Sequence, residues 1–288
     1  MYYGSSSYLR ARRRYYLEQS RYDIAVAVLY AIAFLGGLFV TALAFIKLKC
    51  GGLRHGVATW IRVACVLFTL YCILSTCAFA LISPLAHQTG VGQQEYTKDR
   101  FRRQQDAAQY VGIISSWFHN VTQGLIFIGI MSFCAVTSTR TGSKGCLIVA
   151  YVLGGVLNGL AAAVFAMSVK QYYDLVMGRD MPEPILTLRD VMLAFNCILA
   201  AAALFAAGFA VARLSRSIHT NGRSSKLTVL SSILLLLSAL YQLAVHVEIS
   251  WIYRSWISPP NYLLILGVIL DAWALLGALT LLTVAGKK

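Results

Sequence analysis

Long apolar runs alternate with short polar segments along the whole chain. Seven runs reach the length of about 20 residues that a helix needs to cross a hydrocarbon core of about 30 Å. Because a helix satisfies its own backbone hydrogen bonds in lipid, each run is predicted to be helical. The predicted spans are Asp23–Ile46, Trp60–Leu85, Tyr110–Val136, Cys146–Val169, Asp190–Ala212, Leu227–Ser250 and Tyr262–Ala285.

The run at 110–136 is the least apolar, since polar residues interrupt its first half. An interfacial or re-entrant segment is the alternative for this stretch. The mostly apolar sequence Leu125–Val136 favours a complete crossing. We therefore predict an all-α, polytopic membrane protein built as a bundle of seven transmembrane helices.

Three regions follow from this pattern. Residues 1–22 form a polar tail rich in tyrosine and arginine, residues 23–285 form the transmembrane domain, and residues 286–288 form a short C-terminal tail. The N-terminal tail is expected to be mobile. The first apolar run exceeds the roughly 7–15 residues of a signal peptide, so we expect it to stay in the protein as an anchor.

Composition supports the membrane assignment. Of the 288 residues, 58% are apolar and 12% are charged, whereas a soluble domain carries roughly 25% charged residues. The mean hydropathy is +0.67. These values exclude a water-soluble or disordered chain. The short loops leave no room for a soluble domain that would present bases to nucleic acid, so the net charge of +14 does not predict a nucleic-acid partner.

The charges are distributed unevenly between the two predicted sides. Every acidic residue except Asp271 falls in or beside the N-terminal tail and the second, fourth and sixth loops. The other loops are acid-free and shorter, and their basic residues lie close to the helix ends. By the positive-inside rule this predicts an external N-terminus and a cytoplasmic C-terminus, in the plasma membrane or an endomembrane. The cluster Arg12–Arg14 argues for the opposite orientation. A basic cytoplasmic face would attract anionic lipid headgroups by about 1 kcal/mol per residue.

The seven cysteines predict free thiols. None lies in an outer loop, so no disulfide framework is expected. Cys50 and Cys146 lie at the predicted cytoplasmic boundary, where palmitoylation is the alternative. The spacing fits no zinc pattern, and we expect neither a metal nor a cofactor.

Small residues predict close helix packing inside the bundle. Gly155 and Gly159 form a small-xxx-small pattern. The adjacent Gly36 and Gly37 are assigned a similar packing role. Such surfaces let two helix backbones approach closely. The pair Ala203 and Ala207 is assigned the same role.

Ionisable residues inside the apolar runs are candidates for a functional site. An Asp at a helix centre costs about 2.5–3.5 kcal/mol on insertion scales. Asp271 lies about ten residues, or roughly 15 Å, from the start of its run, and His119 lies at a similar depth. On a helix Ser115, His119, Thr122 and, less tightly, Gln123 share one face, which is predicted to point into the bundle.

Further polar residues lie at central to outer depths of the later helices. Together with His119, Asp271 and Gln123 they are predicted to line a polar cavity that opens outward; they are Asn158, Asn196, Gln242 and His246. The alternative is hydrogen bonding between helices, worth about 0.6 kcal/mol per pair. That alternative is favoured for Asn158 and Asn196, whereas both interpretations stay open for His119 and Asp271.

Three functions from different classes fit these residues. The first is a receptor or sensor without catalytic activity that binds a small molecule in the cavity. The second is a proton-coupled transporter in which His119 and Asp271 form a relay, because histidine changes its charge near neutral pH. The third is an intramembrane metal-dependent hydrolase. His246 and Glu248, about 200° apart on a helix, cannot face one metal, so we place it last.

The receptor class is suggested by topology alone. The third run ends in Phe133-Cys134-Ala135-Val136, without the acidic-Arg-aromatic signature of rhodopsin-like receptors, and the last run lacks Asn-Pro-x-x-Tyr. A local pattern, Leu53-Arg54-His55-Gly56 followed by Trp60-Ile61-Arg62, resembles one in uncharacterised fungal seven-helix membrane proteins. The resemblance covers about a tenth of the chain and implies an integral membrane protein, with no site residues to transfer.

Overall fold

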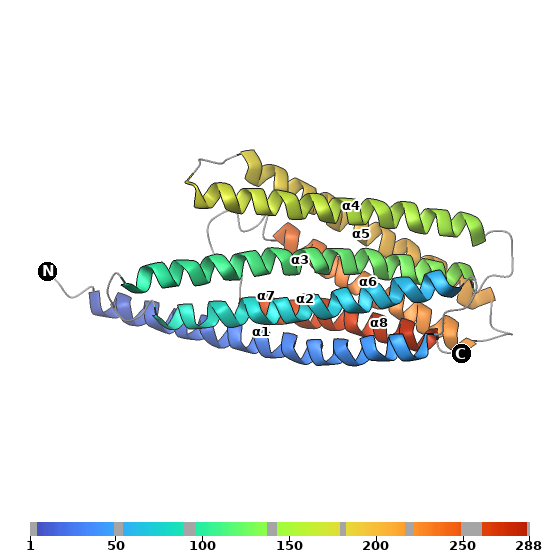
Figure 1. Cartoon of the computed structure of the whole chain (residues 1–288), viewed down its shortest axis with the longest axis horizontal. Helices are drawn as coiled ribbons and strands as arrows, with labels where there is room; N and C mark the ends of the chain where they lie inside the picture. The colour runs from blue at the N-terminus through green and yellow to red at the C-terminus, as the bar shows by residue number, and fades with distance from the viewer. Residues whose placement is uncertain are drawn as a thin grey trace.

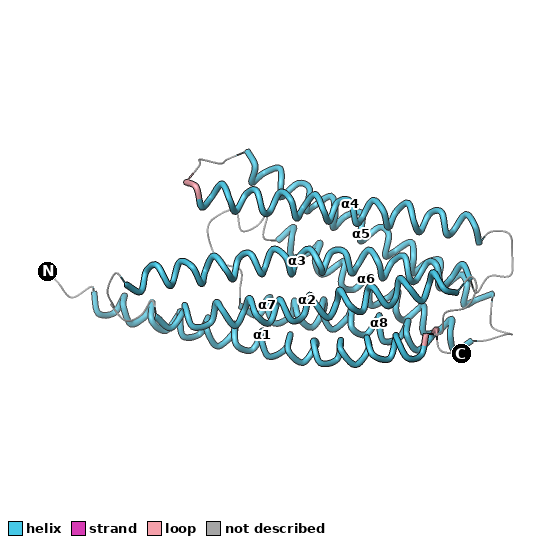
Figure 2. Tube along the Cα trace, viewed as in Figure 1, coloured by secondary structure: helices cyan, strands magenta, loops and turns pink. Residues whose placement is uncertain are grey.

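The computed structural model describes residues 5–48, 54–88, 96–136, 143–178, 183–216, 222–248 and 261–286. Nearly all of them are helical (Figure 2). The helices are α1 (Ser5–Lys47), α2 (Arg54–Gln88), α3 (Tyr96–Val136), α4 (Ser143–Val176), α5 (Glu183–Arg216), α6 (Gly222–Val247), α7 (Asn261–Gly267), the π-helical turn η2 (Val268–Trp273) and α8 (Ala274–Ala285). Helices α7, η2 and α8 follow one another without a break and form a single rod.

Seven helical segments of the described chain are long and apolar enough to cross a membrane, which confirms the predicted architecture. They are Glu18–Lys47, Gly56–Ile82, Arg102–Val136, Lys144–Val176, Thr187–Ser215, Arg223–Val247 and Tyr262–Ala285. Successive rods run in opposite directions, so α1 begins at one end of the bundle and α8 finishes at the other (Figure 1). We call these the N-terminal end and the C-terminal end of the bundle.

Several helices extend beyond the predicted spans. Helix α1 begins at Ser5, so most of the segment for which we predicted a tail is helical; Met1–Gly4 lie outside the described residues. Helix α3 likewise begins at Tyr96. Arg, Glu, Gln and Leu are good helix formers, so a helix need not stop where the apolar run stops. Hydropathy reports the lipid-crossing part of a helix and misses its polar extension.

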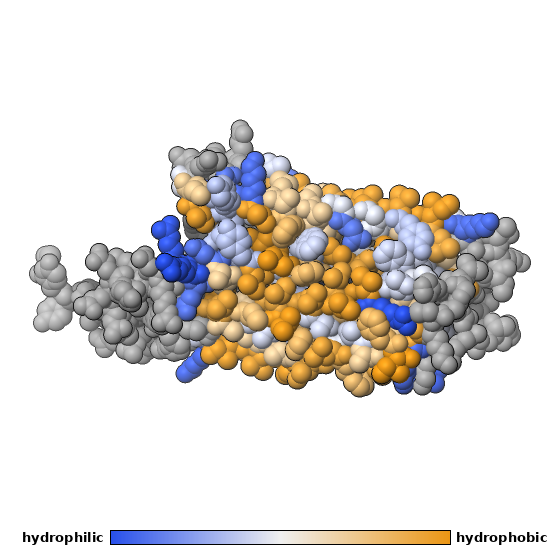
Figure 3. Space-filling model, in the orientation of Figure 1, coloured by the Kyte–Doolittle hydropathy of each residue, from blue (hydrophilic) through white to orange (hydrophobic). Residues whose placement is uncertain are grey.

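The surface of the bundle carries a broad apolar band. Orange residues cover the middle of the face seen in Figure 3, and most blue residues gather toward its two ends. Large side chains such as Leu35, Phe39, Ile46 and Ile148 are more than half exposed. A soluble protein rarely exposes so large an apolar patch, whereas lipid chains solvate it without cost. The exposed Lys47, Lys144 and Lys226 lie at helix ends at the C-terminal end; their contact with anionic headgroups stays a prediction.

Helix α3 is the central helix of the bundle. It runs between the α4–α5 pair and the α1–α2 pair (Figure 1), and 83% of its most apolar window is buried, against 28–44% in the other six spans. Its hydropathy of 1.4 is also the lowest. A helix surrounded by other helices needs no lipid-facing apolar surface, so polar residues are tolerated there. The continuous helix confirms the predicted complete crossing.

Glycine allows close helix approach at some of the predicted positions. A Cβ on Gly37 would lie 3.1 Å from Thr69 Oγ1 and 3.2 Å from a ring carbon of Phe68, so α1 and α2 pack closely there. For Gly155 and Gly159 the prediction of packing inside the bundle is wrong. Both are exposed, and a Cβ on either would meet no atom within 4 Å. The pattern of small residues does not specify which face of α4 is turned inward.

The described cysteines are free thiols, as predicted. Cys146 is buried, and its thiol donates to the backbone carbonyl of Met131 at 3.8 Å. A buried thiol that faces α3 is poorly placed to carry an acyl chain. Cys50 lies outside the described residues.

Arg62 of α2 binds the C-terminal end of α1. Its guanidinium donates to the carbonyl oxygens of Ala44 at 3.3 Å and Phe45 at 3.4 Å and to that of Leu48, and it lies 5.3 Å from the centre of the Phe45 ring. The last carbonyls of a helix have no intrahelical donor and carry partial negative charge. Arg62 supplies a charged donor to this end of α1.

Replacing Arg62 with alanine is expected to reduce the free energy of unfolding by about 1.5–3 kcal/mol, the range for hydrogen bonds to a charged group. The matched control is Lys47→Ala, because Lys47 is an exposed cation in the last turn of α1. The control is expected to change stability by no more than about 0.5 kcal/mol. Thermal unfolding of the purified protein in detergent measures both. Equal effects would show that the guanidinium does not stabilise this helix end.

Candidate functional site

Asp271 lies in a π-helical turn in the middle of the last membrane-crossing rod. The turn, η2, spans Val268–Trp273 and is continued by α8. A π turn contains one more residue than an α turn and is frequently found at functional sites. The extra residue shifts the helical phase locally, and Asp271 and Ala272 are both buried. A regular helix drawn from the sequence does not predict this shift.

The Asp271 carboxylate is contacted by three side chains from two helices, α3 and α6. Nε2 of His119 on α3 lies 3.1 Å from Oδ2, and Nε2 of Gln242 on α6 donates to Oδ1 at 3.1 Å. The hydroxyl of Ser238, also on α6, donates to Oδ1 at 2.5 Å. The Gln242 amide nitrogen also contacts His119 Nε2. Since a carboxylate in a bilayer is costly without partners, these donors explain how the bundle tolerates it.

The network continues behind two of the partners of Asp271, Ser238 and His119. Toward the interior, Gln123 Nε2 donates to Ser238 Oγ at 3.1 Å. Behind His119, the ring of Tyr71 lies 4.6 Å from the imidazole, centre to centre. The Tyr71 hydroxyl pairs with that of Tyr30 at 3.0 Å. Helices α1, α2, α3, α6 and the turn η2 are therefore connected through this one cluster.

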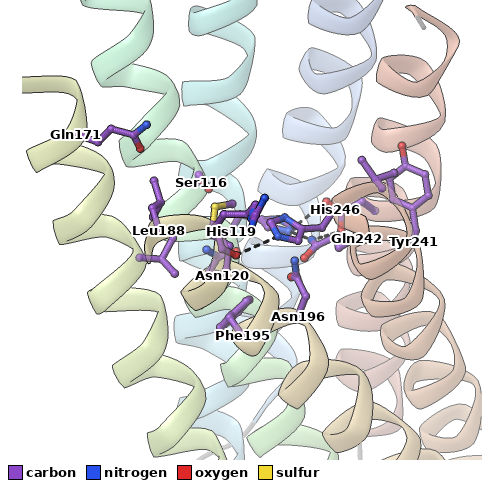
Figure 4. Close-up of a pocket in the computed structure, with 15 residues that line it drawn as sticks. Ser116, His119, Asn120, Gln171, Leu188, Phe195, Asn196, Tyr241, Gln242 and His246 are labelled. Atoms are coloured by element: carbon purple, nitrogen blue, oxygen red, sulfur yellow. Dashed lines mark hydrogen bonds and ion pairs between the residues drawn. The ribbon is translucent and has the colours of Figure 1, made fainter. Parts of the chain in front are cut away.

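A cavity of about 620 Å³ borders this network. It is lined by α3, α4, α5 and α6, with Asp271 of η2. Gln171, Arg189 and His246 line it near the helix ends at the N-terminal end of the bundle, and His119 lines it in the middle of its span. Figure 4 shows His119 of α3, Asn196 of α5 and Gln242 of α6 close together, whereas Tyr241 of α6 lies apart from them. The cavity thus extends from one end of the bundle to its middle.

The structure brings five of the seven predicted candidates to this cavity: His119, Asn196, Gln242, His246 and Asp271. His246 lies toward the N-terminal end, where its Nε2 bonds to the backbone carbonyl of Arg189 at 3.2 Å. The predicted inward face of α3 is buried, since Ser115, His119, Thr122 and Gln123 are each at most 6% exposed.

Gln123 and Asn158 are not among the cavity-lining residues. Gln123 is fully buried and reaches Asp271 through Ser238. Asn158 donates to the carbonyl of Gly154 on its own helix at 2.8 Å, and its carboxamide lies within 3.1–3.3 Å of where a Cβ on Gly124 would be. Asn158 therefore packs between α4 and α3, but its hydrogen bond stays within α4, so the structure does not show the interhelical hydrogen bond favoured for it.

Sequence reasoning missed other polar residues of the site. Ser238 joins the network, and the cavity lining also includes Ser116, Asn120, Gln171, Arg189 and Tyr241. Asn120 carried a usable signal, because it is a polar residue next to His119 in a membrane span. The prediction assumed that α3 has one face toward the bundle and one toward lipid, and Asn120 does not lie on the predicted inward face. The structure shows instead that α3 is buried on almost all sides.

On the far side of the cavity the bundle is tightly packed, mostly by apolar side chains. Phe127, Ile130, Met131, Leu275 and Leu279 are each at most 1% exposed. They occupy α3 and α8 between His119 or Asp271 and the C-terminal end. Within the described residues, the cavity therefore extends from the site toward the N-terminal end, and the packed core lies toward the C-terminal end.

Among the described residues, no group of three or more His, Cys, Asp or Glu side chains is placed to hold a metal ion. Comparisons with protein-family models, with curated proteins and with solved structures find no match to this chain. The resemblance of the segment around Arg54 and Trp60 to fungal membrane proteins stays a prediction, and Leu53 within it lies outside the described residues.

Proposed function

We propose that this seven-helix membrane protein is a receptor-like or sensor protein. It binds a small molecule in the cavity that extends from His119 and Asp271 toward the N-terminal end of the bundle. The N-terminal end of the bundle faces the outside, so the ligand enters from there. The observation that carries the proposal is the cavity itself, which reaches a buried polar cluster in the middle of the bundle.

The size and lining of the cavity support a binding role. Ligand sites measure about 300–1,000 Å³ and combine apolar walls with a few polar groups, and this cavity measures about 620 Å³. Its polar cluster joins four helices and η2, so occupancy can bias how these rods pack. A conformational response of that kind requires a ligand that interacts differently with two arrangements of the helices.

The packed core between the site and the C-terminal end of the bundle favours binding over transport. A proton-coupled transporter needs access from Asp271 to both sides, and the fully buried Phe127, Met131 and Leu279 fill the space toward the C-terminal end. The buried His119–Asp271 pair is the feature that favours transport as the second candidate function. Solute uptake driven by a pH gradient into proteoliposomes, abolished by Asp271→Asn, would establish it in place of the receptor.

Thiol accessibility tests the cavity and its direction together. Gln171→Cys and Asn196→Cys, at the outer and inner parts of the lining, are expected to react with a small membrane-impermeant thiosulfonate added to intact cells. Leu199→Cys, fully buried nearly one turn further along α5, is the matched control and is expected not to react. The exposed Cys77 and Cys197, together with Cys50, are first replaced by serine.

The labelling pattern separates the parts of the proposal. Reaction at both cavity positions in intact cells supports an outward-opening site. Reaction only after permeabilisation would keep the site and invert the orientation. Absence of reaction at both positions under all conditions, in a protein that folds normally, would overturn the cavity as a ligand site.

A further inference from the structure

We propose that the cavity selects an uncharged ligand that carries an amide or neighbouring hydroxyl groups, recognised by the side chains of Asn120 and Asn196. This inference rests on the proposed binding function and names the ligand class. Asn120 belongs to α3 and Asn196 to α5, so the two carboxamides come from different helices that line the same cavity.

The two asparagines line the cavity without a hydrogen-bond partner among the described residues. Asn120 is 8% exposed and Asn196 is 7% exposed, and neither carboxamide is hydrogen-bonded to any residue that the structure describes. Each carries two N–H donors and one carbonyl acceptor. Neither side chain is among the fully enclosed polar groups that lack a partner, so both carboxamides are accessible from the cavity. A ligand with both donors and acceptors would satisfy the two side chains, as an amide or adjacent hydroxyls can.

The charges around the cavity favour a neutral ligand. The Asp271 carboxylate already accepts from His119, Gln242 and Ser238. Arg189, toward the N-terminal end, lies 3.6 Å from the exposed carboxylate of Asp190. At the depth of the asparagines, the two ionisable side chains of the lining, His119 and Asp271, are paired with each other. Placing a lone charge in the middle of a bilayer disfavours binding by roughly a hundredfold.

One part of the lining is apolar. Val164 of α4, with Met192 and Phe195 of α5, accompanies the asparagines. Such side chains accommodate an aromatic or aliphatic body, because apolar contacts bury its surface. The expected ligand therefore joins an apolar body to a neutral polar head.

A charge series on one scaffold tests the inference. The probes are 4-fluorobenzamide, 4-fluorobenzoate and 4-fluorobenzylammonium, which share the ring and differ in charge. They are titrated at neutral pH into the full-length protein in lipid nanodiscs, and binding is followed by fluorine NMR line broadening. The benzamide is expected to bind saturably and at least tenfold more tightly than either ion. Empty nanodiscs correct for partition into lipid.

Two variants test the role of the asparagines. Asn196→Leu is expected to weaken benzamide binding at least tenfold. Cys197→Leu is the matched control, because Cys197 is the next residue of α5 and is exposed; it is expected to leave the affinity unchanged. The charge series needs only the wild-type protein, so it decides the question of charge even if Asn196→Leu fails to fold.

The possible results have distinct meanings. Tighter saturable binding of either ion would overturn the neutral ligand while leaving a small-molecule site in place. Equal benzamide affinity in folded Asn196→Leu would remove the asparagines from recognition. If no probe binds saturably while Gln171→Cys and Asn196→Cys remain reactive, the ligand class is wrong and the cavity stands.

Discussion

Asp271→Ala is expected to lower the free energy of unfolding by about 3–5 kcal/mol, the cost of breaking a buried ion pair by removing one partner. The substitution leaves His119, Gln242 and Ser238 without their shared acceptor. All four side chains lie inside the bundle, where water cannot fully replace the carboxylate. Chemical or thermal unfolding in lipid-like micelles gives the size of the loss.

The matched control for this prediction is Asp190→Ala. Asp190 also pairs with a basic side chain, but its own side chain is 69% exposed. An exposed ion pair contributes between about 0 and 1 kcal/mol, so a small change is expected. The double variant His119→Ala with Asp271→Ala is expected to lose less than the sum of the two single variants, because the pair acts as a unit. Similar losses for Asp271→Ala and Asp190→Ala would show that the buried network does not hold the helices together.

Gly154→Leu is expected to reduce the free energy of unfolding by about 1–3 kcal/mol through overpacking. Gly154 is buried on α4, and a Cβ there would collide with the Ile128 side chain of α3. The collision separates α3 from α4, two of the helices that line the cavity. We therefore expect the same variant to weaken any ligand bound beside His119. Thermal unfolding and benzamide titration measure the two effects.

The adjacent residue provides the control. Gly155 is exposed, and a Cβ on it would meet nothing within 4 Å. Gly155→Leu adds the same side chain one position along the helix, where it points toward lipid, and it is expected to stay within about 0.5 kcal/mol of wild type. A destabilisation by Gly155→Leu as large as that by Gly154→Leu would mean that the α4 face assigned to lipid is in contact with protein.

The site was only partly predictable from the sequence, because α3 is buried on almost all sides. Its pattern of polar and apolar residues therefore does not mark one face as the face of the site. His119 and Asp271 were predicted as a pair, since each is an ionisable side chain at the middle of an apolar run. Asn120 was missed, although it lies beside His119, because a helix enclosed by its neighbours can turn polar groups inward on several sides. The π turn was also unforeseen, because nothing in the apolar sequence around Asp271 marks a local change of helical phase.

The sequence alone determined the number of spans, their approximate limits and the few polar positions that a bilayer makes expensive. These properties depend on the transfer free energy of each side chain into hydrocarbon, which is a local quantity. Only the tertiary structure decided that α3 is central, that Gly155 faces outward and that Asn120 and Asn196 share a cavity. Lipid is as apolar as a leucine side chain, so hydrophobicity cannot tell a helix face in lipid from one in contact with another helix. Shape and hydrogen bonding between helices make that choice, and they exist only once the bundle has assembled.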